Sequence, residues 1–262
     1  IMKILIAYDG TLHAKKALRY GIEKIKKAGG DLIALQVFDR NQFSEYGPRA
    51  EELARAEAAT HWEDARTIIA ESGCADSVHL IAVEGSAPDA IIGHVETDHP
   101  DLVLLPPRYQ SLAKKLGCPV MVIPGTLLVP VDRTGVSAEH TDSIIWEATA
   151  TGSAALLLGI VPIHLYSKEE EIELARIRKD TAAAVKRLKA ELEQKEIAVR
   201  EAIRSGYPDE EILKAAGEFG VSLILLPSGS TTPSELSKAA AILLEEPERL
   251  KWPVVLLNTA SA

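Results

Sequence analysis

The feature that most constrains the fold of this chain is an internal repeat of its apolar segments. The segment Asp101–Pro106, DLVLLP, is matched 121 residues later by Ser222–Pro227, SLILLP. The segment Cys118–Val120, CPV, is likewise matched 134 residues later by Trp252–Val254, WPV. Self-similarity at a fixed spacing is typical of chains that repeat one structural unit. The sequence therefore predicts two copies of one unit fused head to tail.

The length and composition of the chain agree with this duplication. Its 262 residues are enough for two domains of ordinary size, and 47% of them are hydrophobic, so each half can bury a core of its own. The short segment Pro124-Gly125-Thr126 lies between the two copies. We therefore place a first domain at residues 1–124 and a second domain at residues 125–262.

Continuous apolar segments predict five buried strands in each copy. In the first copy they are Met2–Ala7, Asp31–Phe38, Val78–Val83, Asp101–Leu105 and Pro119–Ile123. In the second copy they are Leu127–Val131, a strand within Ala155–Tyr166, then Ile197–Ile203, Ser222–Leu226 and Pro253–Leu257. Helical spacing predicts helices between the strands, among them one that begins after Thr11, then Pro48–Ser72 and Lys168–Gln194. This alternation predicts two tandem α/β domains, Rossmann-like or flavodoxin-like, each a five-stranded parallel sheet with helices on both faces.

Charge and cysteine content exclude several classes of protein. The formal net charge is −9 and no basic stripe is interleaved with aromatic residues, so nucleic acid and anionic membranes are not expected partners. The two cysteines, Cys74 and Cys118, lack metal-ligand spacing, and the seven histidines are scattered, so no metal site is expected. The longest apolar run, around Ala154–Val161, is too short to span a bilayer, and no signal peptide is expected. A reduced, cytoplasmic protein fits these features best.

Three motifs carry a resemblance to a known family. The first strand ends Ala-Tyr-Asp-Gly and leads through a threonine into a helix rich in alanine and lysine, within Ala7–Leu18. Turns containing glycine and proline follow the third strand of each copy, and Cys118–Ile123 opens the last strand of the first copy. In this order, seen twice, the chain resembles tandem members of the universal stress protein family. The resemblance implies an adenine nucleotide alpha hydrolase-like fold and a role in the stress response.

Many members of that family bind ATP, with Mg²⁺. The resemblance implies an adenine pocket beside the aspartate that ends the first strand, here Asp9 and Asp132, with backbone contacts from Val37 and Leu165. It also implies a phosphate-binding loop of pattern G-x-x-G-x9-G-[ST] after the fourth strand. Such a loop uses glycines so that backbone N–H groups can approach the phosphates, and a helix N-terminus that stabilises their charge.

The chain departs from this loop pattern in both copies. Placed without gaps in the second copy, the fixed positions of the pattern fall on Pro227, Ser230, Ala240 and Ala241. No glycine remains there, although Gly229 is close and the hydroxyls of Ser228, Ser230 and Thr231 offer donors. In the first copy Pro119 follows Pro106 by only 13 positions, too few for a loop and a helix, and Arg108 alone offers an anion contact. We therefore expect at most one adenine-nucleotide site, in the second domain.

Plainer interpretations stand beside these. Asp9 and Asp132 are residues that commonly cap helices and turns, and Ser228–Thr232 can also be read as a polar turn ahead of a helix. The alternative function is an interaction or scaffold protein that binds no nucleotide, with a protein partner that the sequence does not identify. No catalytic motif is present, so no enzyme is expected.

The assembly expected from the resemblance is an intrachain pseudo-dimer. In the resembled family the last strands pair across a dimer axis, which here involves Val120–Ile123 and Val254–Leu257. Such pairing would cover two sheet edges that are otherwise exposed. A further homodimer of two such chains stays open.

Overall fold

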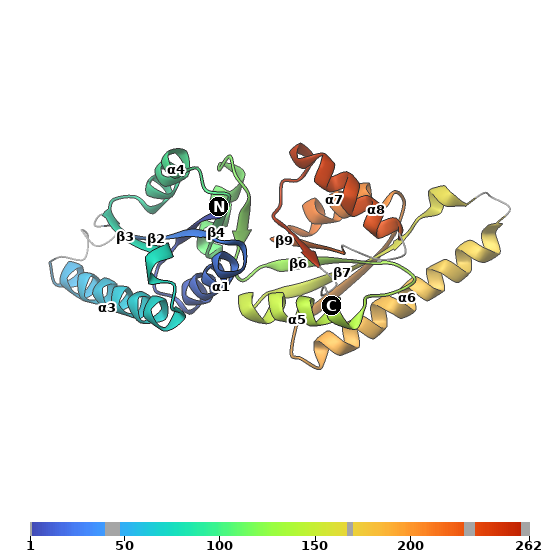
Figure 1. Ribbon diagram of the computed structural model, residues 1–262, viewed down its shortest axis with the longest axis horizontal. Coiled ribbons are helices and arrows are strands. Elements are labelled where there is room, and N and C mark those ends of the chain that lie inside the picture. Colours follow the sequence, from blue (N-terminus) through green and yellow to red (C-terminus); the bar gives the residue numbers. More distant parts are fainter. Residues whose placement is uncertain (1, 40–47, 167–169, 228–233, 258–262) are drawn as a thin grey trace. The chain divides into compact units, whose positions relative to one another are not determined.

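The computed structural model describes residues 2–39, 48–166, 170–227 and 234–257. The chain divides into two compact units, Ile1–Pro124 and Gly125–Ala262, and each is described by itself (Figure 1).

The first domain is a five-stranded parallel sheet in the order β3-β2-β1-β4-β5. Its strands are β1 (Met2–Ala7), β2 (Gly30–Phe38), β3 (Val78–Glu84), β4 (Leu102–Leu105) and β5 (Val120–Val122). Its helices are α1 (Leu12–Ala28), α3 (Pro48–Ser72) and α4 (Ala87–Asp98), with a 3-10 helix at Pro107–Lys114. Helices α1 and α3 lie on one face of the sheet and α4 on the other (Figure 1).

The second domain repeats this arrangement, with a parallel sheet in the order β10-β9-β6-β7-β8. Its strands are β6 (Thr126–Val131), β7 (Ala154–Val161), β8 (Val199–Ser205), β9 (Leu223–Pro227) and β10 (Val254–Leu257). Its helices are α5 (Ala138–Thr151), α6 (Glu171–Glu193), α7 (Pro208–Phe219) and α8 (Glu235–Glu245), with 3-10 turns at Ile163–Leu165 and Pro247–Arg249. Helices α5 and α6 cover one face, and α7 and α8 the other (Figure 1).

The burial of each strand follows its place in the sheet. Strands β1, β4, β6 and β9 are covered by helices on both faces and are buried along most of their length. The edge strands β3 and β8 carry exposed residues at intervals instead. Parallel sheets covered on both faces need continuous apolar strands, which explains why the sequence pattern identified the central strands so directly. The predicted fold class is confirmed in both domains.

Two local features go beyond the sequence prediction. Strand β7 ends at Val161, so the last part of the segment Ala155–Tyr166, which includes His164, forms a 3-10 turn instead of strand. Helix α5 has no counterpart among the predicted elements, because its first turn is polar and the helix does not begin with an apolar segment. Ser137 nevertheless caps its start and Gly152, with φ of 67°, ends it in the left-handed conformation.

The outer strands of the two sheets bear on the expected assembly. Strand β5 pairs with β4, and β10 pairs with β9, so each of them forms one edge of its own sheet. The expected pairing of β5 with β10 stays a prediction. Within the described part of the chain, no helix has both the length and the apolar character needed to span a membrane.

Candidate functional site

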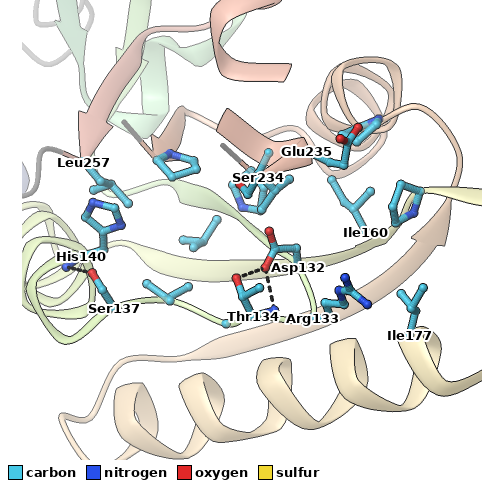
Figure 2. Close-up of a pocket in the computed structure, with 18 of the residues that line it drawn as sticks. Asp132, Arg133, Thr134, Ser137, His140, Ile160, Ile177, Ser234, Glu235 and Leu257 are labelled. Atoms are coloured by element: carbon cyan, nitrogen blue, oxygen red, sulfur yellow. Dashed lines mark hydrogen bonds between the residues drawn. The ribbon is translucent and has the colours of Figure 1, made fainter. Parts of the chain in front are cut away.

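A cavity of about 770 Å³ opens at the carboxyl edge of the second-domain sheet (Figure 2). Its walls come from the ends of β6, β9 and β10, from the turn after β7, and from the first residues of α5, α7 and α8. Most of the surface is apolar, contributed by residues such as Ile160, Pro162, Ile177, Leu236 and Leu257. In open parallel sheets ligands bind at this edge, beyond the carboxyl ends of the strands, at the point where the strand order reverses.

Asp132 lies near the middle of this cavity, directly after β6 (Figure 2). Its Oδ1 accepts hydrogen bonds from the backbone N–H of Thr134 at 2.8 Å and from the Thr134 hydroxyl at 2.5 Å. Asp9 of the first domain makes the same two bonds with Thr11, at 3.0 and 2.5 Å. The turn-forming role that aspartate commonly plays is thus present in both copies. In both aspartates the threonine bonds only to Oδ1, so the second carboxylate oxygen, Oδ2, is available to another partner.

His140 stands beside Leu257 on the wall of the same cavity (Figure 2). Its backbone N–H donates to the Ser137 hydroxyl at 3.2 Å, which fixes the residue in the first turn of α5. The side chain is buried, and its Nε2 has no hydrogen-bond partner among the described residues. An unsatisfied buried nitrogen is costly unless a ligand or water completes it. Sequence reasoning missed this residue among the seven histidines, although a serine three positions before it marks a helix start.

The first residues of α8 form a second wall. Ser234 caps the helix: its hydroxyl accepts from the backbone N–H of Ser237 at 3.1 Å, and the Ser237 hydroxyl accepts from the Ser234 N–H at 2.8 Å. Helix α8 therefore starts several residues before Ala240 and Ala241, the last two positions of the loop pattern when it is placed without gaps, and Ala240 is buried inside the helix.

The remaining predicted site residues divide between the two domains. Leu165 lines the cavity from the 3-10 turn after β7, with 49% of its surface exposed. Pro227, the last residue of β9, also lines it. Ser228, Gly229, Ser230 and Thr231 lie outside the described residues. Val37, in the first domain, pairs with Val83 near the end of β2 and packs against the core.

The space beside Asp9 in the first domain is occupied by protein side chains. Arg108, from the 3-10 helix after β4, places its Nε 3.0 Å from Asp9 Oδ2, an ion pair without the alignment of a hydrogen bond. The Arg108 guanidinium also donates to the hydroxyl of Tyr109 at 2.7 Å. On the other side, a Cβ atom at Gly10 would overlap the ring of His61, so that ring packs directly on the glycine backbone. Arg108 thus contacts an anion, as its type suggested, but the anion is the protein's own carboxylate.

The charged residues of the second-domain cavity are mostly paired. Arg133 Nη1 lies 3.5 Å from Glu173 Oε1. Glu235 accepts a hydrogen bond from Lys238 at 2.6 Å, and its other oxygen lies 3.8 Å from His164 Nε2. No group of three or more histidine, cysteine, aspartate or glutamate side chains in the described ranges could hold a metal ion.

Comparison with known proteins assigns both halves of the chain to the same sequence family. A sequence model described as the universal stress protein family matches residues 1–124 and again residues 125–243. The chain is similar to the solved structure of a universal stress protein from Archaeoglobus fulgidus DSM 4304, with 16% identity, 97% of this chain and 95% of that chain covered, and a TM-score of 0.40. A putative universal stress protein from Pseudomonas aeruginosa UCBPP-PA14 is 17% identical, with coverages of 98% and 92% and a TM-score of 0.39.

A universal stress protein in complex with cAMP is also similar, at 14% identity over 47% of this chain and 96% of that chain, with a TM-score of 0.37. No curated protein sequence matches the chain at a significant level. The two segments matched by the family model cover most of the chain.

Proposed function

The chain belongs to the universal stress protein family, and from this membership we propose that it is a tandem stress-response protein whose second domain binds one adenine-type nucleotide while its first domain binds none. The observation that carries this proposal is the cavity of about 770 Å³ beside Asp132. Small-molecule sites enclose roughly 300–1,000 Å³ and combine apolar walls with a few polar groups, as this cavity does.

The lining residues support distinct roles in such a site. Asp132 Oδ2 is the acceptor for a ribose hydroxyl, because Thr134 engages only Oδ1. Apolar side chains such as Ile160 and Leu165 offer surface for a flat base. His140 Nε2 provides a further hydrogen-bonding group inside the wall. Ser228, Gly229, Ser230 and Thr231 follow β9 in the sequence and stay predictions for the phosphate side.

Mg²⁺ would enter such a site with the phosphates of ATP rather than through a cluster of protein ligands. A bound Mg²⁺ usually keeps one or two carboxylates and several waters besides phosphate oxygens. Asp132 and Glu235 are the carboxylates that line the described part of the cavity. Binding rather than catalysis is the proposed activity, and a cytoplasmic location stays a prediction.

The first domain lacks room for the same ligand. Asp9 is engaged by Thr11 and Arg108, and its side chain is only 6% exposed. A nucleotide would have to displace both the Arg108 side chain and the His61 ring that packs on Gly10. Asp9 and Val37 are therefore proposed to have structural roles.

Native mass spectrometry with a matched pair of variants tests the proposal. Asp132→Ala and Asp9→Ala remove equivalent carboxylates that make equivalent turns. We expect wild type and Asp9→Ala to bind one adenosine nucleotide per chain and Asp132→Ala to lose it. If no nucleotide or nucleoside binds to the wild type at millimolar concentration, the scaffold alternative is favoured. Loss of binding in Asp9→Ala alone would place the site in the first domain and contradict the proposal.

A further inference from the structure

The described lining of the second-domain cavity has more acid than base. Its charged side chains are Asp132, Arg133 and Glu235. The guanidinium of Arg133 already lies 3.5 Å from the carboxylate of Glu173, so its positive charge is shared. The carboxylate of Glu235 is in turn paired with Lys238, which leaves Asp132 as the charged lining residue without an ion pair among the described residues. A ligand with several negative charges therefore finds no unshared cation among the described lining residues.

The helices that begin at the cavity do not compensate for this. A helix N-terminus normally attracts phosphate through its dipole and its free N–H groups. Here α5, α7 and α8 all contribute first residues to the cavity wall, and all three have acidic residues in the first turn. These are Glu139 in α5, then Asp209, Glu210 and Glu211 in α7, and Glu235 in α8. Carboxylates in these positions satisfy the dipoles that would otherwise favour a phosphate.

In the sequence, the residues between β9 and α8, Ser228–Pro233, read SGSTTP and contain no lysine or arginine. Triphosphate-binding loops commonly place a lysine against the outer phosphates. At the start of α8, the hydroxyls of Ser234 and Ser237 are engaged with each other's backbone N–H groups.

We propose that the second-domain cavity selects the nucleoside part of its ligand and discriminates against added phosphates, so that affinity falls from adenosine through AMP to ATP. This inference rests on the proposed function for the base and the ribose. The base is held by apolar walls and the ribose by Asp132, neither of which needs a charged ligand. Each added phosphate brings negative charge toward Asp132 and toward Glu235, which Lys238 pairs from outside the cavity lining, and gains no unshared cation among the described lining residues.

Isothermal titration calorimetry of the full chain with adenosine, AMP, ATP and Mg-ATP tests the inference. We expect adenosine to bind at least about tenfold more tightly than ATP, with a ratio that shrinks as salt rises and screens the repulsion. Binding of ATP or Mg-ATP as tight as that of adenosine, or tighter, would overturn the inference and leave the proposed function intact. Failure of all four ligands to bind would overturn both.

A pair of variants on one helix isolates the electrostatic cause. Glu235→Gln removes a carboxylate from the cavity wall, whereas Glu245→Gln removes one from the far end of the same helix, away from the cavity. The affinity for ATP relative to adenosine should rise several-fold in Glu235→Gln and stay at the wild-type ratio in Glu245→Gln. An equal shift in both variants, or no shift in either, would contradict the role given to the cavity carboxylates.

Discussion

Arg108 Nε lies 3.0 Å from Asp9 Oδ2 in the first domain, whereas the equivalent carboxylate in the second domain, Asp132, lies in an open cavity. The two aspartates make the same turn with a threonine two residues later. The difference between a filled and an open site therefore comes from other parts of each domain. The short segment after β4 supplies Arg108, and none of the described lining residues beside Asp132 has the same role.

Replacing Arg108 should destabilise the first domain modestly. In Arg108→Ala the nearly buried carboxylate of Asp9 keeps only its bonds to Thr11, which we expect to lower the free energy of unfolding by about 1 kcal/mol. Arg133→Ala is the matched control. The side chains of Arg133 and of its ion-pair partner Glu173 are both exposed, so this pair should contribute less than about 0.5 kcal/mol. Urea unfolding measures both. Equal losses would show that Asp9 does not depend on Arg108.

Gly10 should tolerate a side chain much less well than Gly220. Both have positive φ, 73° and 59°, so an alanine costs about 1 kcal/mol in backbone strain at either position. At Gly10 the added Cβ also overlaps the His61 ring, whereas nothing lies within 4 Å at Gly220. We expect Gly10→Ala to cost about 3 kcal/mol in total.

A double variant separates the two contributions at Gly10. Adding His61→Ala to Gly10→Ala should recover the steric part of the loss and leave the backbone part, a coupling that thermal or chemical denaturation can measure. Additive losses from the two substitutions would contradict direct packing of the ring on the glycine.

Replacing a buried threonine in α6 by valine should stabilise the protein. Thr181 is fully buried, and its hydroxyl has no hydrogen-bond partner within the part of the chain that the structure describes. Thr181→Val removes that unsatisfied group at nearly constant volume and should stabilise the protein by about 1 kcal/mol. Thr151→Val is the contrast, because the Thr151 hydroxyl lies 2.7 Å from both the Glu147 carbonyl oxygen and the Ser153 hydroxyl. It should destabilise by about 1–2 kcal/mol in chemical denaturation, and a stabilising result there would contradict the argument.

Tyr8 should make stability fall at high pH. Burial raises the pKa of its hydroxyl to about 12, and the carboxylates of Asp64 and Asp9 add to the rise. Unfolded tyrosine ionises near pH 10, so between about pH 10 and 12 the unfolded state binds fewer protons and the free energy of unfolding decreases, by about 2 to 3 kcal/mol in all. Below pH 10 this contribution is fully present.

The comparison of wild type with Tyr8→Phe isolates this effect from other groups that titrate in alkali. The variant should lack the part of the pH dependence due to Tyr8. Tyrosinate absorbance should show the same number of tyrosines ionising near pH 10 in native wild type and native Tyr8→Phe, because Tyr8 ionises only near pH 12. Identical pH profiles for the two proteins would show that Tyr8 ionises normally.

Much of the fold could be predicted from short segments of the sequence. The limits of β1 and α3 match the predicted ranges, and Thr11 caps α1 as expected. Helix α5 was missed because its start is polar, and the last two positions of the loop pattern, Ala240 and Ala241, fall inside α8, beyond its cap at Ser234. Short-range periodicity identifies strands and helices, but it does not say which side chains meet at the end of a sheet.

The sequence by itself determined the duplication, the strand and helix order and the place of both aspartates at the carboxyl edges, because each of these depends on local patterns of apolar residues and turns. Only the tertiary structure decided that Asp9 is covered by Arg108 and that Asp132 faces a cavity with His140 in its wall. Those contacts join segments far apart in the chain, and whether a side chain fills a space or leaves it open is decided by packing in three dimensions.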